Sequence, residues 1–333
     1  MLPFNQATYL VQVRRSRELA ALALDRYPIR VKKIEFINHG ENTTFRVRAT
    51  GGDYLCRIHR EDYHSTPAIE EELKWLEKLA RDGFAVPNPL RSKKNRLIEN
   101  VAHLGMGSRR VTVFHWIDGR FMSKAISEAR AREIGELLGS FQNHARKIKV
   151  KHRQYWGADG LVGSKPKFGN QDAIVGATRK EQRIITETRK EVLSRVRTYQ
   201  RKFPERMGLI HADLHFGNML IGKDGRIGAI DFDDCGQGFH IYDLTAPLMG
   251  IGYHLTEAKR FREYPKMKAA LIEGYASQVE WDRHDDAVLT DFLMARRLMI
   301  VGWLNARADN PRLQKRVRWG IDRALSYIAD PDV

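Results

Sequence analysis

Hydrophobic and polar positions in the first 115 residues follow two different periods. Residues 6–27 carry apolar side chains at helical spacing, which predicts an amphipathic helix. Thr66 and Pro67 predict the start of a second helix, with Thr66 as its cap and Pro67 in its first position, and Gly83 predicts its end. Short apolar runs read as strands at 34–37, 45–47, 54–58, 97–102 and 109–114. This part of the chain therefore predicts a small antiparallel sheet with helices.

From residue 123 onward the pattern is mainly helical. A first apolar face is formed by Ile134, Leu137, Leu138, Phe141, Ala145 and Ile148. A second lies within 179–206, and several helices follow as far as Tyr327, whereas the glycine-rich stretch 157–169 favours a loop. The pattern predicts an α+β protein of two lobes: an N-terminal lobe 1–114, a hinge and linker 115–122, and a helical C-terminal lobe 123–333.

One short stretch interrupts the helical half. Between Asn218 and Asp231 two apolar runs surround the dipeptide Asp224-Gly225, which is a strong hairpin signal and lies at the midpoint of the stretch. If the dipeptide forms the turn, Asn218 and Asp231 face each other across the open end of the hairpin, with Cα atoms roughly 5 Å apart.

Composition narrows the class of protein. The net charge is +16, and residues 179–206 hold ten Lys and Arg against four Glu, a density that would suit a nucleic-acid partner. Apolar residues recur at helical spacing within that segment, so its bases form a solvated helix face, and nucleic-acid binding is not favoured. Two cysteines indicate free thiols in a reducing cytoplasm. No apolar run approaches the ~20 residues that span a bilayer, so no membrane association is expected.

The hairpin ends carry the candidate chemistry. Mg²⁺ prefers oxygen ligands and is usually held by one or two carboxylates and substrate phosphates, so Asn218 and Asp231 are candidate metal ligands, with Asp233 as a possible addition. Asp213, five residues before Asn218, could accept the proton of an attacking hydroxyl. Taken singly, Asp213 could also be a turn or cap residue. His211 and His215 are expected to shape the loop rather than to act chemically.

Several motifs together resemble the aminoglycoside phosphotransferase and choline kinase superfamily, in particular the branch that holds homoserine-kinase-like and stress-response-kinase-like enzymes. The resemblance covers roughly residues 5 to 305. The segments that carry it are 40–47 (GENTTFRV), 69–76 (IEEELKWL), 115–120 (HWIDGR), 210–221 (IHADLHFGNMLI), 229–236 (AIDFDDCG) and 241–244 (IYDL). It implies a protein-kinase-like fold, ATP and Mg²⁺ as donor and metal, and Asp213 as the catalytic base.

The resemblance also implies a nucleotide site in the N-terminal lobe. The turn residues Asn42, Thr43 and Thr44 would lie over the phosphates, and the backbone around His115 and Trp116 would meet the adenine edge. Arg57 stands where many kinases carry a phosphate-binding Lys. Glu72 on the following helix is its natural partner, with Glu71 as the alternative. The resemblance makes Asp243 a buried carboxylate that braces the catalytic loop.

The acceptor is less well defined than the donor. Only eleven residues separate Asp231 from Asp243, which leaves little room for the long activation segment of conventional protein kinases and favours a small-molecule hydroxyl acceptor. Twelve acids and fourteen bases follow Thr256, so no strongly acidic site for a polycation is visible. Arg296 and Trp303 share a helix face and would line an acceptor pocket, or else belong to a core helix with a snorkelling Arg.

Three functions remain open on this basis. The first is an ATP-dependent phosphotransferase acting on a small-molecule alcohol. The second is a protein Ser/Thr kinase of the stress-response type. The third is a nucleotide-binding or nucleic-acid-associated protein without turnover, suggested by Arg57 in place of Lys and by the basic surface.

Overall fold

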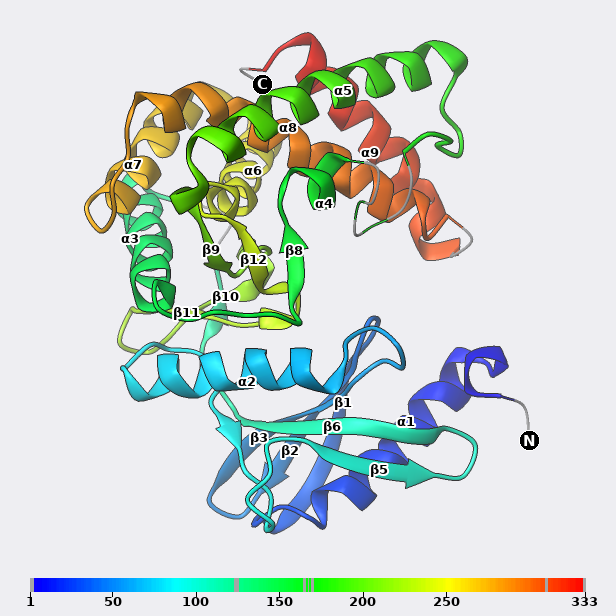
Figure 1. Ribbon diagram of the computed structural model, residues 1–333. Coiled ribbons are helices and arrows are strands. Elements are labelled where there is room, and N and C mark those ends of the chain that lie inside the picture. The colour runs from blue at the N-terminus through cyan, green and yellow to red at the C-terminus, as the bar shows by residue number, and fades with distance from the viewer. Residues whose placement is uncertain are drawn as a thin grey trace. The chain divides into compact units, whose positions relative to one another are not determined.

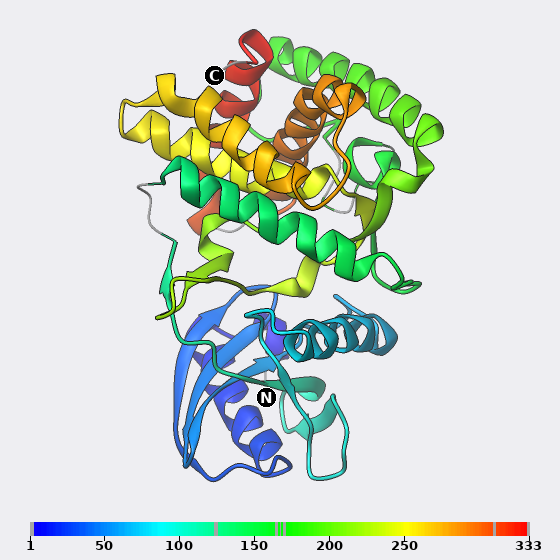
Figure 2. The same cartoon turned by 90° about the vertical axis from the view of Figure 1, so that its left-hand side faces the viewer.

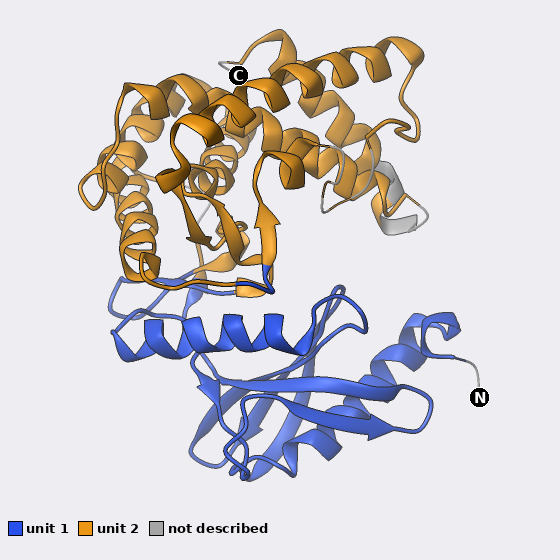
Figure 3. Ribbon diagram, viewed as in Figure 1, with its two compact units in different colours: residues 1–120, 151–153, 220–230 blue, residues 121–150, 154–219, 231–333 orange. Residues whose placement is uncertain are grey.

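The computed structural model describes residues 3–122, 126–163, 166, 168, 171–308 and 311–331. The chain forms two compact units (Figure 3): unit 1 comprises residues 1–120, 151–153 and 220–230, and unit 2 comprises 121–150, 154–219 and 231–333. Both units are discontinuous in sequence. Two short segments from later in the chain, 151–153 and 220–230, therefore complete the unit that the first 120 residues build.

Unit 1 is an antiparallel sheet with helices (Figure 1). The elements are α1 (Tyr9–Leu24), β1 (Val31–His39), β2 (Thr43–Ala49), β3 (Gly52–Ile58), α2 (Thr66–Arg81), β4 (Pro89–Leu90), β5 (Glu99–His103) and β6 (Gly107–His115). The strand order is β1-β2-β3-β6-β4, with β5 paired to the other side of β6. Each strand predicted from the apolar runs 34–37, 45–47, 54–58, 97–102 and 109–114 is present and slightly longer or shifted.

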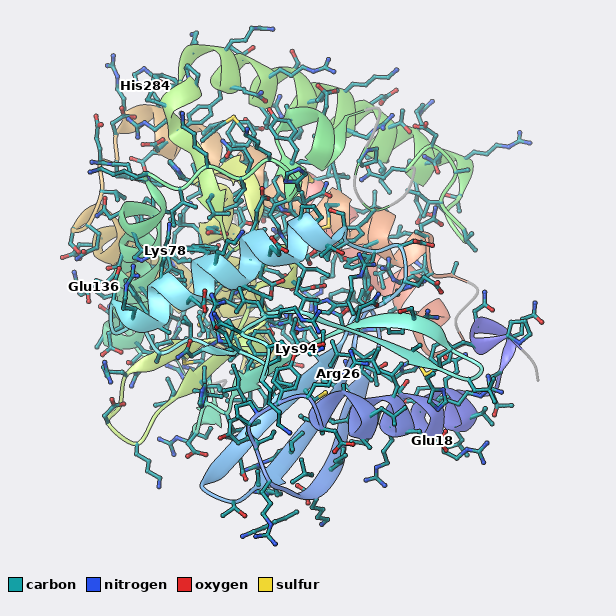
Figure 4. All side chains as sticks on the ribbon, turned by 60° about the horizontal axis from the view of Figure 1, so that its bottom comes forward. Glu18, Arg26, Lys78, Lys94, Glu136 and His284 are labelled. Atoms are coloured by element: carbon teal, nitrogen blue, oxygen red, sulfur yellow. The ribbon has the colours of Figure 1, made fainter. Side chains whose placement is uncertain are left out.

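The core of unit 1 lies between α1 and one face of this sheet. Leu19, Ala23 and Leu24 of α1 pack with Phe45 and Val47 of β2, and all five are almost fully buried. Apolar residues at alternate positions of β2 therefore face α1, as expected for a strand with one buried face. Beyond α1, Arg26, labelled in Figure 4, donates hydrogen bonds of 3.1 Å to Glu99 and 2.8 Å to the carbonyl of Asn100, which ties the helix end to β5.

The start of α2 differs by one residue from the sequence prediction. Ser65, not Thr66, is the N-cap: its hydroxyl accepts a hydrogen bond from the Ala68 amide at 3.3 Å. Thr66 is the first helical residue and Pro67 follows it within the first turn, where its missing N–H costs nothing. Both Ser and Thr are good caps, so residue type alone did not distinguish them.

Unit 2 is mainly helical. Its helices are α3 (Glu128–Ala145), α4 (Ala158–Val162), α5 (Arg179–Lys202), α6 (Tyr242–Glu257), α7 (Tyr264–Ala276), α8 (Arg283–Asn305) and α9 (Pro311–Ala329). Strand β12 (Gly236–Phe239) lies between β8 (Gln154–Trp156), to which it is parallel, and β9 (Met207–Ile210), to which it is antiparallel (Figure 1). The short strand β7 (Arg120–Phe121) lies where the chain passes between the units.

Helices α5 and α4 of unit 2 test two predictions from the sequence. The basic segment forms α5, whose buried residues Ile185, Val192, Val196 and Tyr199 leave the bases on the outer face, as expected. The loop predicted for 157–169 is wrong over Ala158–Val162, where α4 forms, and its residues 164, 165, 167 and 169 lie outside the described residues. Within the described residues no helix is both long and apolar enough to cross a membrane.

The hairpin predicted around Asp224-Gly225 is confirmed. Strands β10 (Met219–Ile221) and β11 (Ile227–Ala229) pair, and the Gly222 amide donates to the Arg226 carbonyl at 3.0 Å. Gly225 has φ +81°, a conformation that favours glycine. Asn218 directly precedes the first strand and Asp231 follows the second by two residues, so the two lie at the open end of the hairpin.

Helices α3 and α7 run side by side at very close range (Figure 2). A Cβ atom added to Gly135 of α3 would lie 2.0 Å from the Leu271 carbonyl oxygen, and one added to Gly274 of α7 would lie 2.0 Å from the Arg132 carbonyl oxygen. Each helix thus meets the backbone of the other at a glycine.

We therefore expect Gly135→Ala to destabilise the protein by about 3 kcal/mol, the upper end of the overpacking range, because the obstacle is backbone. Urea unfolding measures the change. Gly252→Ala in α6 is the matched control: its Cβ would lie 3.4 Å from the nearest atom, so the higher helix propensity of alanine should leave stability unchanged or slightly raised. Equal stabilities of the two variants would contradict the close packing of α3 on α7.

Candidate active site

The candidate catalytic loop, residues 211–218, begins in unit 2 where β9 ends at Ile210. His211 is fully buried, its ring lies 4.4 Å from that of Phe232, and its Nδ1 accepts a hydrogen bond of 3.2 Å from the Asp213 amide. His215 is exposed, and its Nδ1 accepts from the Gly217 amide at 2.9 Å. Both histidines therefore shape the backbone of the loop, as the sequence analysis expected of them.

Asp243 binds the backbone of this loop. The carboxylate lies at the start of α6, is buried, and accepts hydrogen bonds from the amides of His211 at 2.9 Å and Ala212 at 2.6 Å. Burial raises the pKa of Asp243 to about 6, although the two amide hydrogen bonds lower it. The bracing role that the resemblance implied for Asp243 matches this geometry.

Asp213 is partly exposed, with 33% of its side chain accessible, and its partner Arg296 is almost fully buried. Its Oδ1 accepts a hydrogen bond of 2.5 Å from Arg296, and its Oδ2 lies 3.7 Å from Nε2 of His215. Burial raises the pKa of Asp213, and the charges of Arg296 and His215 act in the opposite direction. One carboxylate oxygen thus accepts a short hydrogen bond from Arg296, while the other lies 3.7 Å from the His215 ring nitrogen.

The contact between Arg296 and Asp213 is not indicated by the sequence. Arg296 lies on α8, is almost fully buried and turns toward the catalytic loop, so it neither snorkels to solvent nor pairs with Trp303. Trp303 instead lies 4.5 Å beneath the Arg307 guanidinium. The helix face shared with Trp303 does not identify the loop partners of Arg296, and the acceptor pocket suggested for Arg296 and Trp303 stays a prediction.

The candidate metal ligands lie at the mouth of the hairpin. The Asn218 side-chain amide donates a hydrogen bond of 2.9 Å to the Asp213 carbonyl, which commits its nitrogen and leaves its oxygen for another partner. Asp231 is exposed, and its backbone is in the left-handed conformation, with φ +63°. Asp233, two residues later, is buried. An amide oxygen and a carboxylate are ligands that Mg²⁺ accepts.

This donor set is small. Among the described residues no group of three or more His, Cys, Asp or Glu side chains could hold a metal ion. That is compatible with magnesium, which commonly retains several waters and takes its remaining ligands from substrate phosphates. The residues at the hairpin mouth therefore fit a nucleotide-associated Mg²⁺ rather than a closed structural metal site.

In unit 1, Arg57 of β3 and Glu72 of α2 form an ion pair with 2.7 Å between Nη1 and Oε1, and both side chains are almost fully buried. The ring of Phe114 lies 4.8 Å from the same guanidinium. The pairing expected from the sequence is therefore present, and it involves Glu72 rather than Glu71.

Glu71 has a different task. Its carboxylate accepts hydrogen bonds of 2.9 to 3.1 Å from the amides of Lys151, His152 and Arg153 and lies 2.9 Å from the His152 ring. The Arg153 side chain, fully buried, lies 3.6 Å from the second Glu72 oxygen. We name residues 151–153 the strap. Adjacent glutamates of α2 thus both bind the strap, and Glu72 lies between two buried guanidinium groups.

The turn between β1 and β2 places its three candidate residues differently. Thr44 is the cross-strand partner of Arg57, so their side chains share a face of the sheet. Thr43 faces α1 instead: its hydroxyl lies 2.7 Å from Nδ1 of His39. Asn42 accepts a hydrogen bond of 3.2 Å from the Arg60 amide, which closes the turn against the end of β3. Only Thr44 is brought onto the face of Arg57.

The hinge residues are also partly engaged. The His115 amide donates to the Asn88 carbonyl at 2.9 Å, and the Trp116 amide donates to the Asp53 carbonyl at 3.1 Å. The Trp116 ring lies 4.2 Å beneath the Arg46 guanidinium. Any backbone recognition of an adenine edge at these two positions would therefore use carbonyl oxygens rather than these amides.

The ion pair allows a direct test of cooperation within unit 1. We expect Arg57→Ala and Glu72→Gln each to lower kcat/KM for ATP, and the double variant to lose much less than the sum, because the two side chains act as one unit. Glu72→Gln is used because it removes the charge beside the two buried guanidinium groups but keeps the side-chain volume and one acceptor oxygen, so it opens no cavity. Arg57→Lys should retain substantial activity, since a point charge still attracts phosphate.

Glu71→Gln is the matched control for this cycle, because Glu71 lies next to Glu72 but binds the strap. It should lower stability and show no coupling to Arg57. Strict additivity of Arg57→Ala and Glu72→Gln, measured as activation free energies, would show that the pair does not act on the nucleotide together.

The comparisons with known proteins identify the family. Residues 33–286 match the model of a family described as the phosphotransferase enzyme family, and the chain belongs to that family. A relative, amicoumacin kinase of Bacillus subtilis (strain 168), is 24% identical over 301 residues, which covers 88% of this chain and 85% of the relative. Stress response kinase A of Salmonella paratyphi A and homoserine kinase of Sinorhizobium medicae are also sequence relatives. The resemblance read from the motifs is thereby confirmed, and the protein is a phosphotransferase.

Solved structures confirm the fold. A microcompartment-associated aminopropanol kinase superposes with a TM-score of 0.77 at 26% identity, covering 94% of each chain. An amicoumacin kinase solved in complex with AMP-PNP, Ca²⁺ and Ami superposes with a TM-score of 0.76 at 21% identity, covering 95% of this chain and 96% of that one. The two-lobed, kinase-like α+β fold expected from the sequence is therefore correct.

Proposed function

We propose that this protein transfers the γ-phosphoryl group of ATP to a hydroxyl group of a small molecule. The observation that carries the proposal is the geometry of residues 211–218: Arg296 binds one oxygen of the partly exposed Asp213 carboxylate, and the Asp213 carbonyl accepts the Asn218 amide at the mouth of the hairpin. A family of phosphotransferases supplies the context.

Residues of the loop and of the hairpin mouth have separate roles in this transfer. Asp213 accepts the proton of the acceptor hydroxyl while the hydroxyl oxygen forms its bond to the γ-phosphorus, and the bond from that phosphorus to the β–γ bridging oxygen breaks, releasing ADP. Asn218 and Asp231 would hold Mg²⁺, and Asp233, two residues beyond Asp231, would be a further ligand. When bound, the metal supplies positive charge beside the transferring group.

The nucleotide phosphates are assigned to unit 1. Arg57 binds the phosphates, and Glu72 orients Arg57. Thr44 lies on the same face of the sheet as Arg57. The backbone carbonyls of His115 and Trp116 are assigned to the adenine edge. Asn42 and Thr43 contribute through their backbone amides rather than their side chains, because both side chains are engaged within unit 1.

A small amino alcohol or hydroxy amino acid is the acceptor class that we favour. A relative by structure is named an aminopropanol kinase, and relatives by sequence are named homoserine kinase and amicoumacin kinase. The short interval between Asp231 and Asp243 also leaves little room for a peptide-binding segment.

The test is a panel assay with the full chain and MgATP. Amino alcohols, hydroxy amino acids, sugars and aminoglycosides are added singly, ADP release is followed by a coupled assay, and the product is identified by ³¹P NMR. We expect acceptor-dependent ADP release with an amino alcohol or hydroxy amino acid, forming a phosphate monoester.

Two outcomes would replace the proposal. Phosphate transfer to the protein itself or to generic protein substrates, with no response to any small molecule, would identify a protein kinase, the activity that the stress-response relative makes the second candidate. ATP binding without hydrolysis or transfer would identify a nucleotide-binding protein whose turnover has been lost.

A further inference from the structure

One guanidinium group connects α8 to two consecutive residues of the catalytic loop. Arg296 Nη1 donates a hydrogen bond of 2.8 Å to the Ala212 carbonyl, and Nη2 donates one of 2.5 Å to Asp213 Oδ1. Only 5% of the Arg296 side chain is exposed, and Tyr242 lies 5.5 Å from its guanidinium. A buried, forked contact of this kind restricts both direction and distance, which a single point charge does not.

The contact falls on a strained residue. Ala212 has φ +69°, a left-handed conformation that is unfavourable for a residue with a Cβ atom. Asp243 binds the amide of Ala212 at 2.6 Å, and Arg296 binds its carbonyl at 2.8 Å. Such strain persists where the surroundings over-determine the backbone, and here the two flanking peptide groups are each fixed by a buried charged side chain.

The two oxygens of Asp213 are thereby made unequal. Oδ1 is occupied by Arg296, whereas Oδ2 lies 3.7 Å from Nε2 of His215. The His215 Nδ1 accepts the Gly217 amide, so a neutral His215 carries its proton on Nε2, on the side of Asp213. His215 does not occupy Oδ2, because 3.7 Å is beyond hydrogen-bond distance. The carboxylate has one anchored oxygen and one that can meet a hydroxyl.

We propose that Arg296 is a positioning residue for phosphoryl transfer: its guanidinium anchors Oδ1 of Asp213 and the Ala212 carbonyl, so that Oδ2 is the oxygen that accepts the proton of the acceptor hydroxyl. This inference rests on the proposed function, in which Asp213 is the base. Arg296 touches neither nucleotide nor acceptor and acts only through the loop. No covalent bond of Arg296 forms or breaks in the reaction.

The test compares Arg296→Ala, Arg296→Gln and Arg296→Lys, with Arg297→Ala as the control. Arg297 is the next residue of α8, but its guanidinium lies 3.7 Å from the ring of Tyr327 and belongs to the packing of α8 with α9. We expect Arg296→Ala to lower kcat by about 10²-fold, the loss typical of a misplaced catalytic group. KM for ATP should stay within a few fold, and Arg296→Lys should retain an intermediate kcat.

Added guanidinium ion provides a readout that a merely structural role would not move. At concentrations below those that unfold the protein, it should raise kcat of Arg296→Ala by filling the vacated position, and it should not raise kcat of Arg297→Ala or Asp213→Asn. Arg296→Gln preserves most of the side-chain volume and serves if the alanine variant fails to fold. Wild-type kcat in folded Arg296→Ala or Arg296→Gln, or a loss of kcat without rescue by guanidinium, would overturn the inference.

A double variant separates this inference from the proposed function. If Arg296 acts through Asp213, adding Arg296→Ala to Asp213→Asn should lower kcat no further, because residues that act as a unit are not additive. A full additional loss would show that Arg296 acts elsewhere. Near wild-type turnover in Asp213→Asn alone would instead refute the assignment of Asp213 as base. Loss of turnover in Asp213→Asn with none in Arg296→Ala would refute only the role of Arg296.

Discussion

Replacement of Asp213 by asparagine is expected to lower kcat by about 10²- to 10⁴-fold while leaving the Kd for MgATP nearly unchanged. The amide keeps the shape of the side chain and can still accept the Arg296 hydrogen bond at Oδ1, but it cannot take a proton from the acceptor hydroxyl. The change should therefore fall on the chemical step alone.

Single-turnover kinetics and equilibrium titration with MgATP measure the two quantities separately. Asp224→Asn is the matched control: Asp224 lies in the turn of the catalytic hairpin, is exposed, and accepts the Arg226 amide, a role that asparagine also fills. Turnover of Asp213→Asn within a few fold of the control would remove Asp213 from the mechanism.

Asp231→Ala should instead weaken Mg²⁺-dependent ATP binding by at least about 10-fold, because even the outer partners of metal ligands are commonly worth 10- to 100-fold in metal affinity. Asp231 is left-handed, with φ +63°, so alanine also introduces backbone strain. Asp231→Asn tolerates that conformation and removes only the charge, so the two variants together separate the ligand from the backbone.

The measurement is the Kd of ATP with and without Mg²⁺ in each form. The wild type should bind ATP more tightly when Mg²⁺ is present, and both variants should lose most of that difference. A variant that keeps the whole magnesium effect would show that the metal does not bind at the mouth of the hairpin.

Features set by neighbours in sequence were predictable. The hairpin followed from Asp224-Gly225 between two apolar runs, since a two-residue signal specifies the turn and the turn specifies which residues meet. Thr43 shows a signal that was present and not used. It shares the strand alternation of Phe45 and Val47, which face α1, so its side chain could have been assigned to the face opposite Arg57.

Contacts between distant segments were not predictable from one sequence. Arg296 and Asp213 are 83 residues apart, and the apolar pattern of α8 indicates that Arg296 is interior without naming its partner. Glu71 and the strap are separated by about 80 residues in the same way, and nothing in the residues 151–153 marks them as partners of α2. The resemblance alone directed attention to Arg57 and Glu72, because it transfers pairings that periodicity does not contain.

The strap has a consequence for how this protein could be divided or recombined. The first 120 residues end before the strap and before the segment 220–230, whose Ala229 amide donates to the Ala85 carbonyl at 2.9 Å. A fragment cut at residue 120 would lack the three amides that bind Glu71 and the second guanidinium beside Glu72. Chimeras that exchange residues 1–120 between homologues should therefore also exchange 151–153 and 220–230. The unit that folds together consists of these three separate stretches of the chain.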